Sequence, residues 1–194
     1  MASNTTTYTY QHTCKRGQKA YILANAPFRS VKKRTAGGKT FIPFLGEGFY
    51  LWEENKEAAE YWGKRNYNGQ HSIVEYTDTQ INNDDLLDFC NRRDIQFFKE
   101  LQNIYIEKSP TSKNWNLGTW IEFFKKLHVE NKVNFPFYFF RAQEEISEAE
   151  RKKHQIGALK INLSSPGYSV DLDPYIMICA TDKNKLIYSN RSIL

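Results

Sequence analysis

Apolar residues follow one another along the chain in two periods, which predict where strands and helices lie. A period of two, or a short continuous apolar run, is typical of a strand, and a period near 3.6 is typical of a helix. The predicted strands lie at residues 6–11, 40–44, 49–52, 72–77, 135–141, 157–163, 175–180 and 185–189. The predicted helices lie at 18–24, 56–66, 83–91 and 94–107, around 120–127, and in a short polar segment that begins at 147. This mixture predicts an α+β fold.

The chain is expected to form a single domain over residues 1–194, with a mainly helical insertion at about 83–130. A length of 194 residues suits one substantial core. Phe98, Phe123 and Phe124 belong to apolar stripes of the insertion, which favours core packing over a ligand site. The last two predicted strands are separated by a short polar turn, so they are expected to form a hairpin.

Residues 44–62 carry the most specific pattern in the chain. Gly46 and Gly48 let the backbone turn closely just before a short apolar strand. Asn55 then provides a good N-cap, and the helix that it begins has an acidic residue and two alanines near its start.

Two tyrosines of this segment are candidates for a binding site. Tyr50 lies on the strand and Tyr61 on the helix, with the small residue Ala58 leaving room beneath them. We expect the two rings to bracket one flat cavity that accepts an aromatic ring. The alternative is a glycine-rich loop before an ordinary core strand, with both tyrosines only packing.

The segment resembles the nicotinamide-binding part of the ADP-ribosyltransferase fold, in the branch that includes the poly(ADP-ribose) polymerases and diphtheria toxin. That branch has a Gly-x-Gly-(Ile/Phe)-Tyr strand, followed by a helix with a small residue and a second tyrosine. The resemblance covers about residues 6–77 and 171–189, and it implies a split β-sheet core with flanking helices. The matching positions of the segment are Gly46, Gly48, Phe49, Tyr50, Ala58 and Tyr61.

The resemblance extends upstream to a strand that ends in histidine. The branch has His-Gly-(Ser/Thr) there, and this chain has His12 followed by Thr13, which stands where glycine is usual. The resemblance implies that His12 bonds a ribose of NAD, that backbone at the next residue holds the carboxamide, and that the two tyrosines hold the nicotinamide. It implies an NAD site formed by His12, Thr13, Arg29, Gly48, Phe49, Tyr50, Ala58 and Tyr61, with His12 and Tyr50 also catalytic.

The third catalytic group of the branch is a glutamate just ahead of a C-terminal strand. Direct register puts Pro174 in that position, and proline has no side chain that could serve. Asp173 is therefore expected to be the catalytic acid, with Asp171 beside it and Glu144 or Glu145 as further alternatives. Without the glutamate, single transfer is a better expectation than chain elongation, and a protein that only binds is also compatible.

Composition adds a bias toward anionic partners. The formal net charge is +5, and the basic loop from Arg29 to Lys39 should suit a dinucleotide diphosphate or a nucleic acid. The three cysteines are widely separated and form no zinc pattern, so no metal is expected and a reducing compartment is favoured. No apolar run reaches the roughly 20 residues that a membrane span needs, and no secretory signal is visible, which predicts a cytoplasmic protein without a membrane partner.

The sequence thus predicts a mono-ADP-ribosyltransferase that uses NAD as substrate. An intracellular toxin or defence effector is expected, with a protein or nucleic acid as acceptor and an antitoxin or inhibitor protein as a further partner. One alternative is a catalytically inactive domain of the same fold that binds NAD or ADP-ribose. The other is an unrelated basic nucleic-acid-binding protein.

Overall fold

The computed structural model describes residues 4–144, 160–162, 169–171 and 174–194. Within these residues there are four α-helices: α1 Lys19–Asn25, α2 Lys56–Tyr67, α3 Arg92–Lys108 and α4 Leu117–Val129. Three short 3₁₀ turns are η1 Asn83–Asp85, η2 Pro110–Asn114 and η3 Lys183–Lys185. The strands are β1 Thr5–Lys15, β2 Arg29–Ser30, β3 Lys33–Arg34, β4 Thr40–Phe41, β5 Gly48–Glu53, β6 His71–Asn82, β7 Leu86–Asp88, β8 Phe139–Glu144, β9 Lys160–Asn162, β10 Ser169–Asp171, β11 Tyr175–Ala180 and β12 Asn190–Ile193. The predicted α+β class is confirmed.

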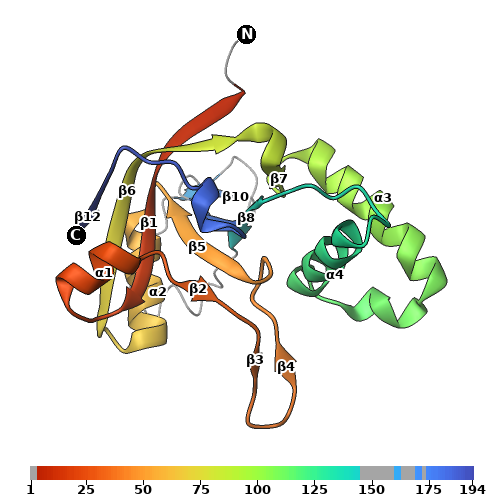
Figure 1. The fold of residues 1–194 in the computed structure, drawn as a ribbon, viewed down its shortest axis with the longest axis horizontal. Coiled ribbons are helices and arrows are strands. Elements are labelled where there is room, and N and C mark those ends of the chain that lie inside the picture. The colour runs from red at the N-terminus through yellow and green to blue at the C-terminus, as the bar shows by residue number, and fades with distance from the viewer. Residues whose placement is uncertain (1–3, 145–159, 163–168, 172–173) are drawn as a thin grey trace.

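One eight-stranded sheet organises the fold (Figure 1). Seven strands follow the order β12-β6-β1-β5-β11-β8-β7, and β2 joins beside β5. Neighbours are antiparallel except β7 and β8. The longest ladder joins β1 to β6, from Thr5 opposite Asn82 to Lys15 opposite His71. β1 meets β5 over only a short stretch, and this contact connects the β1–β6 side of the sheet to the β11–β8 side.

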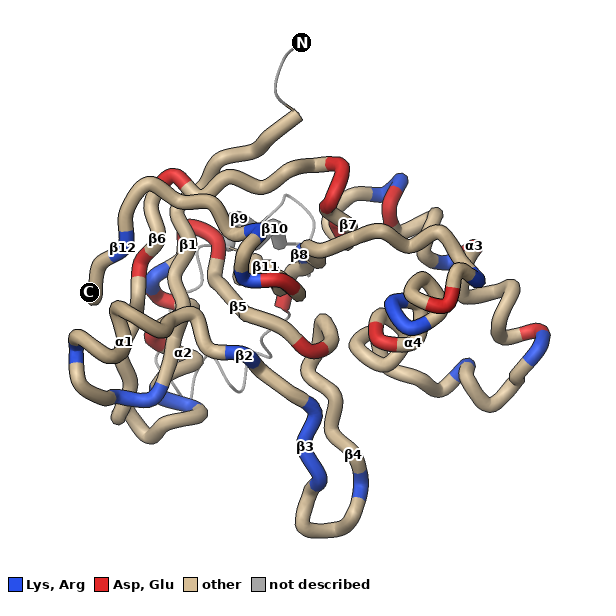
Figure 2. Tube along the Cα trace, viewed as in Figure 1, with Lys and Arg blue, Asp and Glu red and all other residues tan. Residues whose placement is uncertain are grey.

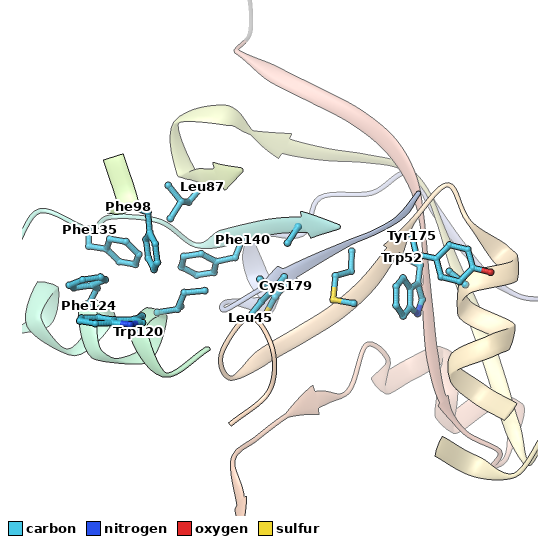
Figure 3. Close-up of a cluster of buried hydrophobic side chains, with 14 of the residues drawn as sticks. Leu45, Trp52, Leu87, Phe98, Trp120, Phe124, Phe135, Phe140, Tyr175 and Cys179 are labelled. Atoms are coloured by element: carbon cyan, nitrogen blue, oxygen red, sulfur yellow. The ribbon is translucent and has the colours of Figure 1, made fainter. Parts of the chain in front are cut away.

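Each face of the sheet has its own apolar core, because successive side chains of a strand point to opposite faces. On β5, Trp52 and Tyr50 pack into one cluster, whereas Leu51 and Phe49 pack into the other. The first cluster lies against α2, α3 and α4, and Figure 3 shows its aromatic side chains. The expected core role of the insertion's aromatic stripes is confirmed at Phe98 and Phe124, which are 4% and 0% exposed.

Residues 83–91 were expected to be helical, but that prediction is wrong. The side chain of Asn82 accepts a hydrogen bond from the Asp84 N–H, which caps only the single turn η1. Leu86 and Leu87 then continue as β7, which pairs in parallel with β8. A backbone partner that follows α3 and α4 in the chain therefore outweighs the local helical signal.

The prediction that residues 175–180 and 185–189 form a hairpin is also wrong. After β11, which is an interior strand, the chain makes the turn η3 and crosses to the edge of the sheet beside β6. There β12 pairs with β6, with Asn190 opposite Thr77, and Ile187 makes an isolated bridge to Gln80. Alternation along the sequence identifies a strand but does not identify a partner so far away in the chain.

The remaining differences concern where strands begin and end. The 135–141 segment becomes a strand only at Phe139, and the 40–44 segment is a strand only over Thr40–Phe41. Of the 157–163 segment, the structure describes Lys160–Asn162 as β9, and the helix expected from 147 lies outside the described residues. No helix in the described part of the chain is long and apolar enough to cross a membrane.

Candidate functional site

The candidate site lies along one edge of β5, where β1 pairs with one end of the strand and β2 with the other. We call the gap between these two ladders the fork. β1 pairs with β5 only at Gln11 opposite Trp52 and at the pair before it. The chain then leaves the sheet through α1 and returns as β2, which pairs at Arg29 opposite Phe49. Tyr50 lies between these two short ladders, so its backbone on this side needs another partner.

The side chain of His12 supplies that partner. Its Nδ1 lies 2.8 Å from the carbonyl oxygen of Tyr50, and its Nε2 lies 3.0 Å from the backbone nitrogen of Phe28. The Phe28 N–H can only donate, so Nε2 must accept and the ring proton must sit on Nδ1. His12 thus bridges β5 and the segment that enters β2.

The environment of His12 keeps its ring neutral. The side chain is only 5% exposed. Burial lowers the pKa of His12 to about 4, although the hydrogen bond to Tyr50 opposes part of that shift. Near neutral pH the ring therefore acts as one donor and one acceptor, and both are used by backbone groups.

Tyr50 is fixed at both its backbone and its hydroxyl. The hydroxyl accepts from the Leu45 N–H at 2.7 Å and donates to the Gly46 carbonyl at 2.8 Å. Burial raises the pKa of Tyr50 far above its ordinary value, so the phenol stays protonated. The loop that carries Leu45 and Gly46 thereby folds back over the tyrosine that follows it.

The two glycines of the motif are required by close packing around this loop. Gly46 has φ +81°, and a Cβ there would lie 2.5 Å from Oε1 of Glu122. A Cβ on Gly48 would lie 2.5 Å from Sγ of Cys179 and 2.6 Å from the carbonyl oxygen of Ala180. A larger residue at position 48 would press on the backbone of β11, and one at position 46 would be strained by the positive φ and would have to move the Glu122 side chain.

Helix α2 places Ala58 and Tyr61 on the same side of the sheet as Tyr50. The helix starts at this position because Asn55 Oδ1 accepts from the Ala58 N–H at 2.8 Å. Ala58 and Tyr61 are 0% and 2% exposed and belong to the cluster against which Tyr50 packs. The Tyr61 ring lies 6.3 Å from that of Tyr175, and its hydroxyl accepts from Arg65 at 3.1 Å.

The other predicted residues divide into those near the fork and those elsewhere. The Thr13 hydroxyl donates to the Ala59 carbonyl at 2.8 Å, which ties β1 to α2. Arg29 is exposed on β2. Glu144 ends β8 opposite Tyr175 and is partly buried. Asp171 ends β10, and its side chain, like Asp173 and Glu145, lies outside the described part of the chain.

His12 and Tyr50 are neighbours through the backbone, but their side chains point to opposite faces of the sheet. Gln11 and Trp52 are opposite each other and share a face, and Tyr50 is two residues from Trp52. His12 is one residue from Gln11, so its side chain lies on the other face, near the ring of Phe28. The structure thus brings Tyr50, Ala58 and Tyr61 to one face and His12 to the other.

One carboxylate near Tyr50 was not identified from the sequence. Oε1 of Glu122, on α4, accepts from the Glu47 N–H at 2.8 Å and from Lys125 Nζ at 2.8 Å. Its charge also contributes to the raised pKa of Tyr50. In the sequence Glu122 lies among aromatic residues that were expected to form core. It is far from residues 47–50 in the chain, so the sequence did not predict its hydrogen bond with the Glu47 N–H.

A second polar cluster lies at a cavity of about 700 Å³ between β1, β7, β8 and the start of α3. Arg141 reaches Glu53 with Nε at 2.8 Å and NH2 at 2.6 Å, and its NH1 lies 3.1 Å from Oδ2 of Asp88. The Tyr10 hydroxyl donates to Glu53 at 3.3 Å. The hydrogen bond with Glu53 raises the pKa of Arg141, so the guanidinium stays charged. These groups satisfy one another, which favours a structural role for the cluster.

The described residues contain no group of three or more His, Cys, Asp or Glu side chains arranged to hold a metal ion. Comparison with protein-family models, with curated proteins and with solved structures finds no match to this chain.

Proposed function

We propose that this protein is a mono-ADP-ribosyltransferase that cleaves the bond between nicotinamide and ribose in NAD and transfers ADP-ribose to a protein or nucleic acid. The observation that supports this most strongly is the hydrogen bond between the His12 ring and the backbone carbonyl of Tyr50, which lies between the ladders that join β1 and β2 to β5, although the two side chains lie on opposite faces of the sheet. Ala58 and Tyr61 follow on the next helix, on the Tyr50 side. Histidine strand, tyrosine strand and tyrosine helix occur in the order that the ADP-ribosyltransferase resemblance implies. A toxin or defence effector in the cytoplasm, with an inhibitor protein as partner, belongs to the same proposal.

The proposed reaction needs a held leaving group and a carboxylate. The C1′–N1 bond breaks, nicotinamide leaves with the electron pair, and the ribose becomes oxocarbenium-like before the acceptor attacks C1′ and gives its proton to a base. In this proposal Tyr50 presents its ring to nicotinamide while its hydroxyl stays bound to the 45–46 loop. Asp173 is the proposed acid, and Glu122 is a second carboxylate close to Tyr50.

His12 can serve a ribose only by exchanging a partner. Both of its ring nitrogens already bind backbone groups. A ribose hydroxyl that donates to Nε2 would take the place of the Phe28 N–H and leave the Tyr50 bond intact. His12 would then hold substrate and the tyrosine strand through one ring.

The proposal is tested with NAD labelled in its adenylate part, incubated with the protein and a cell extract. Wild-type protein should transfer label to a macromolecule. Tyr50→Phe keeps the ring and should keep most NAD affinity, whereas Tyr50→Ala loses a stacking face and should weaken NAD binding by about 1 kcal/mol or more. Tyr138→Ala is the matched control, because Tyr138 is 39% exposed and comes just before β8, which β11 separates from β5.

The result that would overturn the proposal is a folded wild-type protein with neither label transfer nor saturable NAD binding. Unchanged NAD affinity in Tyr50→Ala would overturn the role of the tyrosine.

The second candidate is a catalytically inactive domain that binds NAD or ADP-ribose. The occupied ring nitrogens of His12 favour it, because a histidine fully used by backbone has a sufficient structural reason to be present. Saturable NAD binding without label transfer, for wild type and for every acceptor tested, would select this candidate.

A further inference from the structure

Residues 31–44 form an arm that extends away from the body of the protein (Figure 1). Its two strands, β3 and β4, pair only with each other, with Lys33 opposite Phe41 and Arg34 opposite Thr40. Every residue from 31 to 41 is exposed. A two-stranded ribbon of this size has little stability by itself in water. Its folded conformation therefore depends on the residues that attach it to the body of the protein, or on a binding partner.

The root of the arm is held on both sides. The Lys32 N–H donates to Oε1 of Glu47 at 2.6 Å, and the Gly46 N–H donates to the Pro43 carbonyl at 2.9 Å. Gly118, at the start of α4, packs so closely on the Pro43 carbonyl that a Cβ there would overlap it. The arm is therefore a fixed projection beside β5 and not a free tail.

The arm carries most of the excess positive charge of the chain. Residues 30–46 hold four basic residues and no acidic residue, against a formal net charge of +5 for all 194 residues. Figure 2 shows this basic segment on the extended arm. Lysines elsewhere, such as Lys125 and Lys185, contact carboxylates at 2.8 and 3.0 Å. Within the described chain none of the four arm cations has an ion-pair partner: Lys32, Lys33, Arg34 and Lys39.

Two exposed aromatic rings accompany these cations. Phe41 is 57% exposed and Phe44 is 45% exposed, and neither ring contacts another aromatic ring in the described structure. Lys33 is directly opposite Phe41, so the two side chains share one face of the ribbon. A cation next to an unstacked ring can contact a phosphate and an adjacent base together.

We propose that this arm binds single-stranded nucleic acid. Its unpaired positive charge complements a phosphate backbone, and its free phenylalanine rings offer stacking surfaces that only unpaired bases can use. An acidic protein surface would satisfy the charge but would leave the two rings without a planar partner. This proposal goes beyond the transferase and does not depend on it.

The proposal is tested by fluorescence anisotropy with labelled twelve-residue oligo(U) and oligo(dT) at several salt concentrations. Four phosphate contacts would give a slope of log K against log[salt] of about −2.8. Replacing Lys32, Lys33, Arg34 and Lys39 by glutamine should reduce affinity at least tenfold and flatten the slope. The double variant Phe41→Ala, Phe44→Ala should weaken binding at least about fivefold while keeping the slope. Comparing the two oligonucleotides distinguishes RNA from DNA.

The matched control removes the same charge elsewhere. Lys15, Lys19, Lys99 and Lys113 are all exposed and lie off the arm, and their joint replacement by glutamine should leave affinity within about threefold. Circular dichroism should show that all variants are folded. Equal loss in the arm and control variants would overturn the proposal, because it would assign binding to net charge alone. No binding by wild type, equal binding of a duplex, or arm-dependent binding of poly(glutamate) instead of nucleic acid would also overturn it.

Discussion

Replacing His12 by alanine should destabilise the fold because one ring bridges two separate backbone segments. The bridge joins the Tyr50 carbonyl to the Phe28 N–H at 2.8 and 3.0 Å from the ring nitrogens. Alanine removes both partners from a site in which the histidine was 5% exposed. A buried polar group that loses its partner costs about 1–3 kcal/mol, and two groups lose theirs, so the expected loss at pH 7.5 is about 2–6 kcal/mol.

The pH dependence separates this explanation from a simple loss of packing. The pKa of His12 in the folded protein is lowered from 6.5 to about 4. As pH falls below 6.5, the unfolded chain therefore binds a proton before the folded protein does. Stability is complete above pH 6.5 and declines toward pH 4, by about 3 kcal/mol over that window. The His12→Ala protein lacks this titrating side chain, so its free energy of unfolding should not show that part of the decline with falling pH.

The measurement is urea unfolding of wild type and His12→Ala, followed by circular dichroism between pH 7.5 and 4.5. Other titrating groups are common to both proteins, so the difference between the two free energies of unfolding isolates His12. That difference should be largest at pH 7.5 and should shrink as the pH falls. A difference that stays constant across the range would refute the buried, neutral bridge.

Two further predictions concern carboxylates. Glu53→Gln should destabilise the protein by about 3–5 kcal/mol in urea unfolding, because the Arg141 and Glu53 side chains are only 17% and 8% exposed and the guanidinium would lose its main partner. Glu130→Gln, which alters an exposed pair with Lys132, should change stability little. Equal destabilisation by the two substitutions would contradict the prediction. In the labelled-NAD assay, Asp173→Asn should reduce transfer while NAD affinity stays near wild type, and loss of transfer in Glu122→Gln instead would identify Glu122 as the acid.

The parts of the fold that could be predicted from sequence are those encoded by neighbouring residues. β5 and α2 were located closely because glycines, an N-cap asparagine and two alanines act within a few residues of one another. β7 and β12 could not be assigned, because their stability comes from strands far away in the chain, β8 for Leu86 and β6 for Asn190. A local pattern specifies an exposed and a buried face but does not specify which strand lies beside it.

The candidate site divides in the same way. The spacing of Tyr50, Ala58 and Tyr61 predicted one cavity between two tyrosine rings; the three residues belong to one packed cluster, but the Tyr61 ring packs against Tyr175, and the cavity beside Arg141 is lined by neither Tyr50 nor Tyr61. The spacing was not enough to predict that Tyr50 would bind its own loop, or that Glu122 of α4 would reach that loop. Those contacts depend on how α4 packs beside the 45–47 loop, which no short motif encodes.

The positions of the fork and the arm connect the two proposals. β2 ends at Ser30, opposite Gly48, and the arm begins at the next residue; the arm returns through Pro43 and Gly46 to Gly48. Both ends of the arm are thus attached to the strand that carries Tyr50, and the Tyr50 hydroxyl binds the returning end at Leu45 and Gly46. A strand of nucleic acid held by the arm would begin next to the proposed NAD site, where an acceptor must lie for transfer. If both proposals hold, the arm variant should lose transfer to nucleic acid while it still cleaves NAD, and this result would separate binding of an acceptor from cleavage.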